Sequence, residues 1–166
     1  MKVAWVSPET LAIAANAGLG MLLTNQKSWA EYREDVTNFN AVRAERGWGP
    51  VQPTVVVNVA CFDTEAEAWE TMRRHMIEAQ ISVERHYNFT DAGHFARAGN
   101  YDFYRDFAKT LASKTPEEVG EFNAKPQAWG TQDQCLEKLT AIQEMTSAEE
   151  LILSFRYGGM PAEVAE

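Results

Sequence analysis

Two hydroxyl side chains, Ser7 and Thr10, flank the expected start of the first helix, in the stretch Ser7-Pro8-Glu9-Thr10. Serine is a favourable N-cap, and proline suits the first position of a helix. Because the N–H groups at a helix N-terminus have no partner within the helix, they and a capping hydroxyl form a natural site for an anion such as phosphate. The same residues also suit a helix cap without a ligand, so the pattern alone leaves both interpretations open.

The other reactive side chains lack a catalytic spacing. Cys61 lies in an apolar run without a basic neighbour, and Cys135 lies in an amphipathic helical pattern. We interpret both as buried free thiols of a protein in a reducing compartment. The histidines His75, His86 and His94 are separated by gaps that fit no common metal site. No two carboxylates form a recognisable pair of general acid and base.

The composition predicts one acidic globular domain, residues 1–166. The chain has 24 acidic and 15 basic residues and a net charge of -9. This balance argues against nucleic acid as a partner, because nucleic-acid-binding domains carry basic patches. Since no apolar run approaches the roughly 18 residues of a membrane-spanning helix, we also expect no membrane partner and a cytoplasmic location.

The elements that must position these residues alternate between strands and helices. Apolar runs predict strands over 3–6, 19–23, 54–62 and 151–155. Capping signals and helical spacing predict helices over 10–17, 28–46, 64–87 and 135–145. This alternation predicts an α/β fold with four parallel strands. The stretch 88–129 interrupts it without a strand signal, and we interpret that stretch as a helical insertion or lid before the last strand–helix unit.

Several stretches, spread over nearly the whole chain, carry a family resemblance. They are Ser7-Pro8-Glu9-Thr10, Gly18-Leu19-Gly20-Met21-Leu22-Leu23, His86-Tyr87-Asn88, Gly130-Thr131-Gln132-Asp133-Gln134-Cys135, and Leu151-Ile152-Leu153-Ser154-Phe155 with Gly158-Gly159-Met160-Pro161. In this order they resemble the C-terminal half of the bacterial-luciferase-like flavin-dependent monooxygenases. The resemblance implies a partial (β/α)8 TIM barrel whose four strands correspond to barrel strands 5–8. A complete barrel needs roughly 250 residues.

The resemblance also implies the cofactor and its contacts. The family uses reduced FMN and O2, and one branch uses a deazaflavin instead. By position, Ser7 and Thr10 would hold the flavin phosphate, and Thr24 would lie near the flavin ring. Arg156 and Tyr157 would face the flavin or the substrate. The family's catalytic histidine and phosphate-binding arginine belong to the other half of the barrel, so we predict no catalytic residue and no metal ligand here.

The function expected from the resemblance is that of a fragment or subunit of a flavin-dependent monooxygenase, which oxygenates a small organic substrate. We do not expect this chain to be active alone. Its expected partners are a complementing N-terminal half-barrel or further copies of itself. Two alternatives stay open: a non-catalytic half-barrel that self-assembles, and a flavin-binding protein without turnover.

Overall fold

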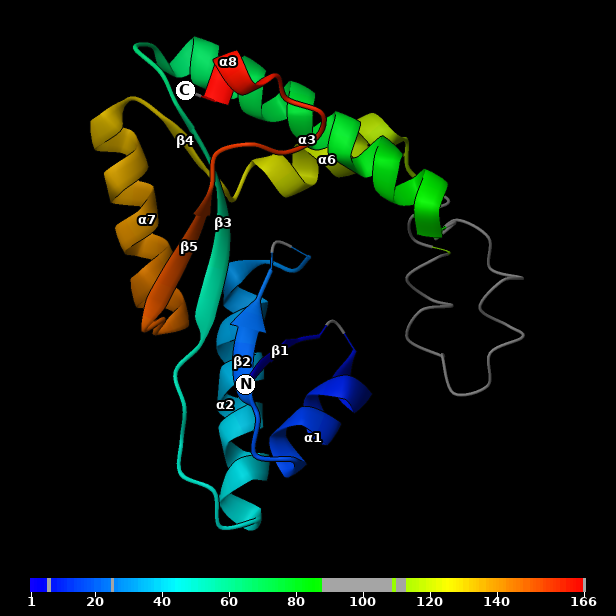
Figure 1. Ribbon diagram of the computed structural model, residues 1–166, viewed down its shortest axis with the longest axis vertical. Helices are drawn as coiled ribbons and strands as arrows, with labels where there is room; N and C mark the ends of the chain where they lie inside the picture. Colours follow the sequence, from blue (N-terminus) through cyan, green and yellow to red (C-terminus); the bar gives the residue numbers. More distant parts are fainter. Residues whose placement is uncertain (6, 25, 88–108, 110–112, 166) are drawn as a thin grey trace.

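The structure is a computed structural model, and it describes residues 1–5, 7–24, 26–87, 109 and 113–165. Strands and helices alternate along most of this chain (Figure 1). The strands are β1 (Lys2–Ala4), β2 (Gly20–Leu23), β3 (Thr54–Cys61), β4 (Ala128–Gly130) and β5 (Glu150–Ser154). The helices are α1 (Pro8–Asn16), α2 (Trp29–Glu45), α3 (Glu65–Tyr87), α6 (Pro116–Ala124), α7 (Gln132–Thr146) and α8 (Ala162–Ala165).

The five strands form one parallel sheet. Their order is β1-β2-β3-β4, and β5 also pairs with β3. Leu23 of β2 lies opposite Val55 of β3, while Ser154 of β5 lies opposite Asn58. Every strand pair is parallel. The α/β fold class with a parallel sheet is therefore confirmed.

Strand β4 was missed by the sequence analysis, which treated residues 88–129 as free of strands. It pairs with the end of β3, where Ala60 lies opposite Trp129. Its three residues, Ala-Trp-Gly, are too few to show a β-strand periodicity. The other described part of this stretch contains α6, whereas residues 88–108 and 110–112 lie outside the described residues. Its interpretation as an insertion or lid stays a prediction.

Reciprocal capping pairs define the start of two helices, and α7 begins at Gln132, three residues before its expected start. The Ser28 N–H donates to the Glu31 carboxylate at 2.9 Å, and the Glu31 N–H donates back to the Ser28 hydroxyl at 3.3 Å. Thr115 and Glu118 form the same reciprocal pair at the start of α6. Each pair satisfies two N–H groups that would otherwise lack a partner, and this fixes the first turn of the helix.

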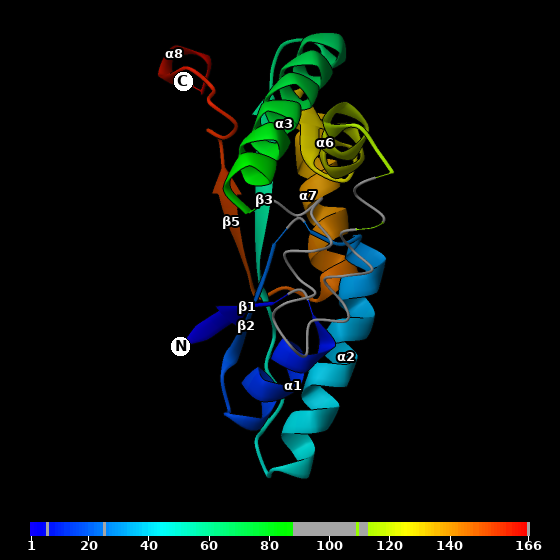
Figure 2. The same cartoon turned by 90° about the vertical axis from the view of Figure 1, so that its right-hand side faces the viewer.

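The main core lies between the sheet and the helices α1, α2 and α7, which cover one of its faces (Figure 2). Val55, Val57 and Val59 alternate along β3 and point into this core. Trp5 stacks on Phe39 of α2, with 4.9 Å between the ring centroids and 6° between the ring planes. The alternation places the intervening residues of β3 on the opposite face of the sheet.

A second core lies beneath α3 and α6, which pack side by side beyond the carboxyl end of β3 (Figure 1). Its buried members are Ala60, Met72, Met76 and Ala124. No helix in the described part of the chain is long and apolar enough to cross a membrane.

Strand β5 exposes apolar side chains. Ile152 is 46% exposed, Leu153 is 39% exposed, and Phe155, just past the strand, is 48% exposed. Within the described residues β5 pairs with β3 alone. Its other edge therefore presents unpaired backbone groups beside apolar side chains, a combination that favours association with another strand.

Candidate functional site

The first candidate site is the N-terminus of α1, just beyond the carboxyl end of β1. The hydroxyls of Ser7 and Thr10 lie 3.2 Å apart, and the Thr10 N–H donates to the Ser7 hydroxyl at 3.4 Å. Ser7 is 5% exposed, so its orientation is fixed by packing. The structure thus brings together the two hydroxyls that the sequence analysis singled out.

The electrostatics of this helix start are mixed. The positive end of the helix dipole and the partly engaged Thr10 N–H favour an anion there. Pro8 contributes no N–H, and the exposed Glu9 places a carboxylate in the same turn. The donors present can therefore bind one side of a phosphate group. A cation from elsewhere is needed to neutralise its charge and that of Glu9.

Thr24 lies immediately after β2, next to α2. It lies near Tyr32, a fully buried residue of α2 whose hydroxyl has no hydrogen-bond partner within the described residues. Burial raises the pKa of Tyr32, and the interaction with Thr24 opposes that rise. Thr24 follows β2 as Ser7 follows β1, and both therefore lie at the carboxyl end of the sheet, where parallel α/β folds bind their ligands.

Arg156 and Tyr157 lie in a different environment after β5, where Arg156 is exposed and Tyr157 packs against α3. The Arg156 Nε donates to the Met160 carbonyl at 2.9 Å, and the Tyr157 hydroxyl donates to the Met72 sulfur at 3.2 Å. Burial raises the pKa of Tyr157 well above its ordinary value. The Tyr157 contact attaches the segment after β5 to α3, whereas the Arg156 contact lies within that segment.

The strand register explains why these residues form two groups. The end of β2 is level with Val55, and the end of β5 is level with Asn58. Three residues of strand correspond to about 10 Å along the sheet. The structure therefore places Ser7, Thr10 and Thr24 at one level of the sheet and Arg156 and Tyr157 farther toward α3.

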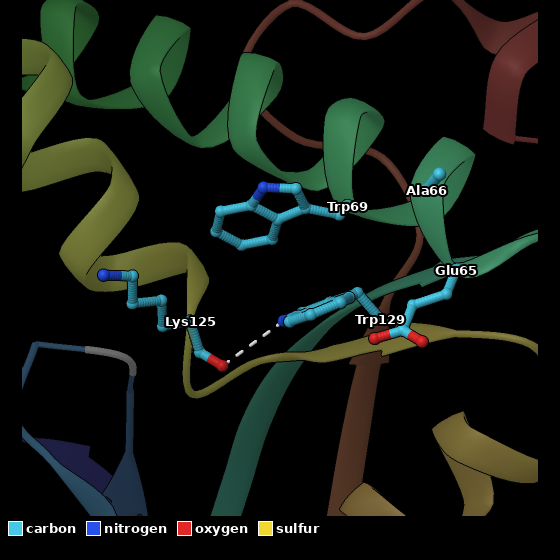
Figure 3. Close-up of a pocket in the computed structure, with 5 residues that line it drawn as sticks. All are labelled: Glu65, Ala66, Trp69, Lys125 and Trp129. Atoms are coloured by element: carbon cyan, nitrogen blue, oxygen red, sulfur yellow. Dashed lines mark hydrogen bonds between the residues drawn. The ribbon is translucent and has the colours of Figure 1, made fainter.

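The second candidate site is a cavity of about 510 Å³ at the carboxyl ends of β3 and β4 (Figure 3). Its lining residues are Glu65, Ala66, Trp69, Lys125 and Trp129. The two indole rings have centroids 4.8 Å apart and planes inclined by 48°. The Trp129 Nε1 donates to the Lys125 carbonyl at 3.3 Å, as the dashed line in the figure indicates.

Lys138 of α7 holds Trp129 in place. Its Nζ lies 3.2 Å from the centroid of the Trp129 ring and donates to the Trp129 carbonyl at 2.6 Å. Burial lowers the pKa of Lys138. Sequence reasoning missed this cavity because it did not detect β4, which carries Trp129. A tryptophan directly before Gly130 was the available signal.

Cys61 differs from its prediction as well. It is exposed, whereas Cys135 is buried as expected. Cys61 is the last residue of β3, and the sheet ends there without covering it. The described residues contain no group of three or more histidine, cysteine or acidic side chains that could hold a metal ion.

A parallel sheet with helices on its outer face and hydroxyls after its strands defines the class: an α/β protein that forms part of a (β/α)8 barrel. The family model of the luciferase-like monooxygenases matches residues 3–149. The chain belongs to this family. A search of curated proteins finds no match.

Solved structures show the same fold at low sequence identity. Monooxygenase RslO1 from Streptomyces bottropensis is 16% identical, with a TM-score of 0.58, over 99% of this chain and 43% of that protein. The oxygenating constituent of 3,6-diketocamphane monooxygenase from Pseudomonas putida, solved with FMN, is 17% identical, with a TM-score of 0.53, over 92% of this chain and 40% of that protein.

Flavoprotein 390 is 14% identical, with a TM-score of 0.58, over 99% of this chain and 62% of that protein. This chain therefore spans less than two thirds of the length of each of these three proteins. Together with the family match, these similarities confirm the fold class as part of a TIM barrel.

Proposed function

We propose that this chain is the C-terminal half-barrel of a flavin-dependent monooxygenase and that it supplies one side of the flavin phosphate site. The observation that carries the proposal is the pair of hydroxyls on Ser7 and Thr10 at the N-terminus of α1. They lie at the carboxyl end of β1, in a chain of the luciferase-like family. In a barrel of this type, ligands bind at that end of the strands.

Each residue has a defined part in the proposal. Ser7 and Thr10 donate hydrogen bonds to the phosphate, and the N-terminus of α1 adds its positive dipole. Thr24 borders the flavin ring. Arg156 and Tyr157 stay a prediction on the flavin or the substrate side, and their contacts with Met160 and Met72 also give them a structural part. Reduced flavin, when bound, supplies the reaction with O2.

FMN is the cofactor we propose, and a deazaflavin is the alternative. A structural neighbour solved with FMN supports the first choice. The hydroxyl pair suits the terminal phosphate of FMN because it offers two donors at one point. A reducing cytoplasmic location, expected from the two cysteines, belongs to the same proposal.

The partner we propose is an N-terminal half-barrel. It would pair with the free edge of β5, cover Ile152, Leu153 and Phe155, and supply the cation that the Ser7 site requires. The free edge and these exposed side chains also support a second candidate function, a non-catalytic half-barrel that closes by association with another copy of itself.

Flavin titration tests the proposal. Purified chain is titrated with FMN and with a deazaflavin, alone and after mixing with the N-terminal half of a luciferase-like monooxygenase, and flavin fluorescence is followed. We expect a saturable change with FMN that is strongest in the mixture. No change with either flavin in either preparation would reject the proposal and leave the self-assembling half-barrel as the explanation.

A further inference from the structure

Cys61 and Cys135 are brought together from two elements at the carboxyl end of the sheet. Cys61 ends β3, and its register partner is Gly130 at the end of β4. Cys135 lies in the first turn of α7, and its sulfur lies 3.6 Å from the Gly130 carbonyl oxygen and 3.7 Å from that of Ala60. The two carbonyls that contact the Cys135 sulfur thus belong to the neighbour of Cys61 in sequence and to its partner in the sheet.

The side-chain alternation of β3 points Cys61 toward Cys135. Val55, Val57 and Val59 face the core beneath α7, so the residue two positions beyond Val59 faces the same side. Cys135 belongs to that core. Burial is the main cause that raises the pKa of Cys135, and the nearby Cys61 is a further cause.

The two sulfurs differ in access to solvent. Cys61 is exposed and Cys135 is buried, and both are free thiols. An exposed thiol can react with a dissolved oxidant. A buried thiol beside it is shielded from that oxidant and reacts instead with the oxidised sulfur of the exposed cysteine. Burial raises the pKa of the Cys135 thiol, and the positive charge of Lys138, one turn further along α7, opposes only part of that rise.

We propose that Cys61 and Cys135 form a peroxide-reactive thiol pair that closes reversibly to an intramolecular disulfide. The Cys61 thiol gives its proton to solvent, and the thiolate attacks the O–O bond of a hydroperoxide. An S–O bond forms to give the sulfenic acid, and the expelled hydroxide or alkoxide takes up a proton from solvent to leave as water or an alcohol. The Cys135 thiol then attacks the sulfur of this sulfenic acid, forms the S–S bond and releases water. The two thiols lose two electrons, the hydroperoxide gains them, and a dithiol reverses the reaction by exchange.

Closure would join the end of β3 to the first turn of α7, beside the cavity that contains Trp129. Gly130 already contacts both cysteines, because it pairs with Cys61 in the sheet and its carbonyl oxygen contacts the Cys135 sulfur. This inference is independent of flavin binding, since neither cysteine is assigned a contact with flavin.

The test treats the full chain with hydrogen peroxide and follows it by mass spectrometry. We expect the loss of two hydrogen atoms per chain, the loss of both alkylatable thiols in denaturant, and recovery of both after dithiothreitol. The two cysteines fall in different tryptic peptides because Arg73 and Arg74 lie between them. A linked peptide pair that disappears on reduction therefore identifies the bond.

Two variants separate the roles of the thiols. Cys135→Ser should accumulate a sulfenic acid on Cys61 that dimedone traps, whereas Cys61→Ser should leave Cys135 unoxidised at the same peroxide concentration. Comparing the masses and free thiols of the untreated and the peroxide-treated wild-type chain tests the proposal even where Cys135→Ser does not fold. A free Cys135 thiol after treatment, a bond only between Cys61 residues of two chains, or equal oxidation of Cys135 in Cys61→Ser would overturn the proposal.

Discussion

Gly158 lies directly against the backbone of His75, so that a Cβ atom at Gly158 would come within 1.7 Å of the His75 carbonyl oxygen. The backbone there has a φ of +55°, which also favours glycine. The His75 Nδ1 lies 2.7 Å from the Glu78 carboxylate and 3.4 Å from the Gly158 carbonyl oxygen. This close approach holds the segment after β5 on α3 and explains why Tyr157 lies there.

Substituting Gly158 should therefore lower the free energy of unfolding more than substituting its neighbour Gly159. Gly159 has a similar φ of +73°, but a Cβ there would meet nothing closer than 3.8 Å. We expect Gly159→Ala to lower the free energy of unfolding by about 1 kcal/mol, the cost of a left-handed residue. Gly158→Ala adds a backbone clash and should cost roughly 2–4 kcal/mol. Urea unfolding of both variants measures the difference, and equal losses would contradict the close packing.

Lys138 should stabilise the second core through Trp129. Lys138→Gln removes the ammonium from the face of the indole ring and should cost about 1–2 kcal/mol of unfolding free energy. Lys125→Gln is the matched control, because Lys125 contacts Trp129 through its carbonyl oxygen. We expect it to cost less than about 0.5 kcal/mol. Thermal unfolding followed by tryptophan fluorescence tests this, and a larger loss in Lys125→Gln would contradict it.

Cys135 should make stability fall at alkaline pH. Burial, with a smaller contribution from Cys61, raises the pKa of its thiol from the ordinary 9.0 to about 11. Between these values the unfolded chain has lost more protons than the folded chain, so the free energy of unfolding decreases as the pH rises. Below the ordinary pKa this effect is absent.

Paired variants isolate that contribution. Cys135→Ala should flatten the fall in stability between pH 9 and pH 11, whereas Cys61→Ala should keep most of it, since burial of Cys135 is the main cause. Urea unfolding at a series of pH values measures both slopes. Identical slopes in the wild type and Cys135→Ala would contradict the assignment.

Much of the fold could be predicted from the sequence because its signals are local. The β-branched run around Val57 predicted β3, and Ser28 with Glu31 predicted the start of α2. Strand β4 could not be found in this way, because three residues form a strand only through pairing with β3. Exposure of Cys61 likewise depends on where the neighbouring elements end.

The candidate site was predictable only in part for the same reason. Ser7 and Thr10 are adjacent in the first turn of one helix, and their proximity follows from helical geometry. The position of Tyr157 depends on the packing of Gly158 against α3, and the cavity beside Trp129 depends on three separate elements. No local pattern encodes such contacts between distant segments.

The exposed face of β5 should drive association of the isolated chain. Ile152→Lys places a charge on the edge strand, and we expect it to lower the average mass at high protein concentration. Leu136→Lys is the matched control, because Leu136 is 56% exposed on α7 and not on the sheet. Sedimentation equilibrium measures the masses. A wild-type chain that stays monomeric at every concentration, or an equal effect of both variants, would contradict this expectation.

The most direct measurement compares the affinity for FMN with the affinity for riboflavin, which lacks the phosphate. It is made on the wild type, Ser7→Ala and Ser28→Ala, each in the mixture with the N-terminal half of a luciferase-like monooxygenase. Both variants lose a helix cap, but only Ser7 lies at the proposed phosphate site. We predict that Ser7→Ala weakens FMN binding about tenfold or more, the value of one hydrogen bond to a charged group, and leaves riboflavin binding unchanged. Ser28→Ala should affect neither. Equal affinity of the wild type for FMN and riboflavin, or an equal loss for both ligands in Ser7→Ala, would contradict the phosphate site.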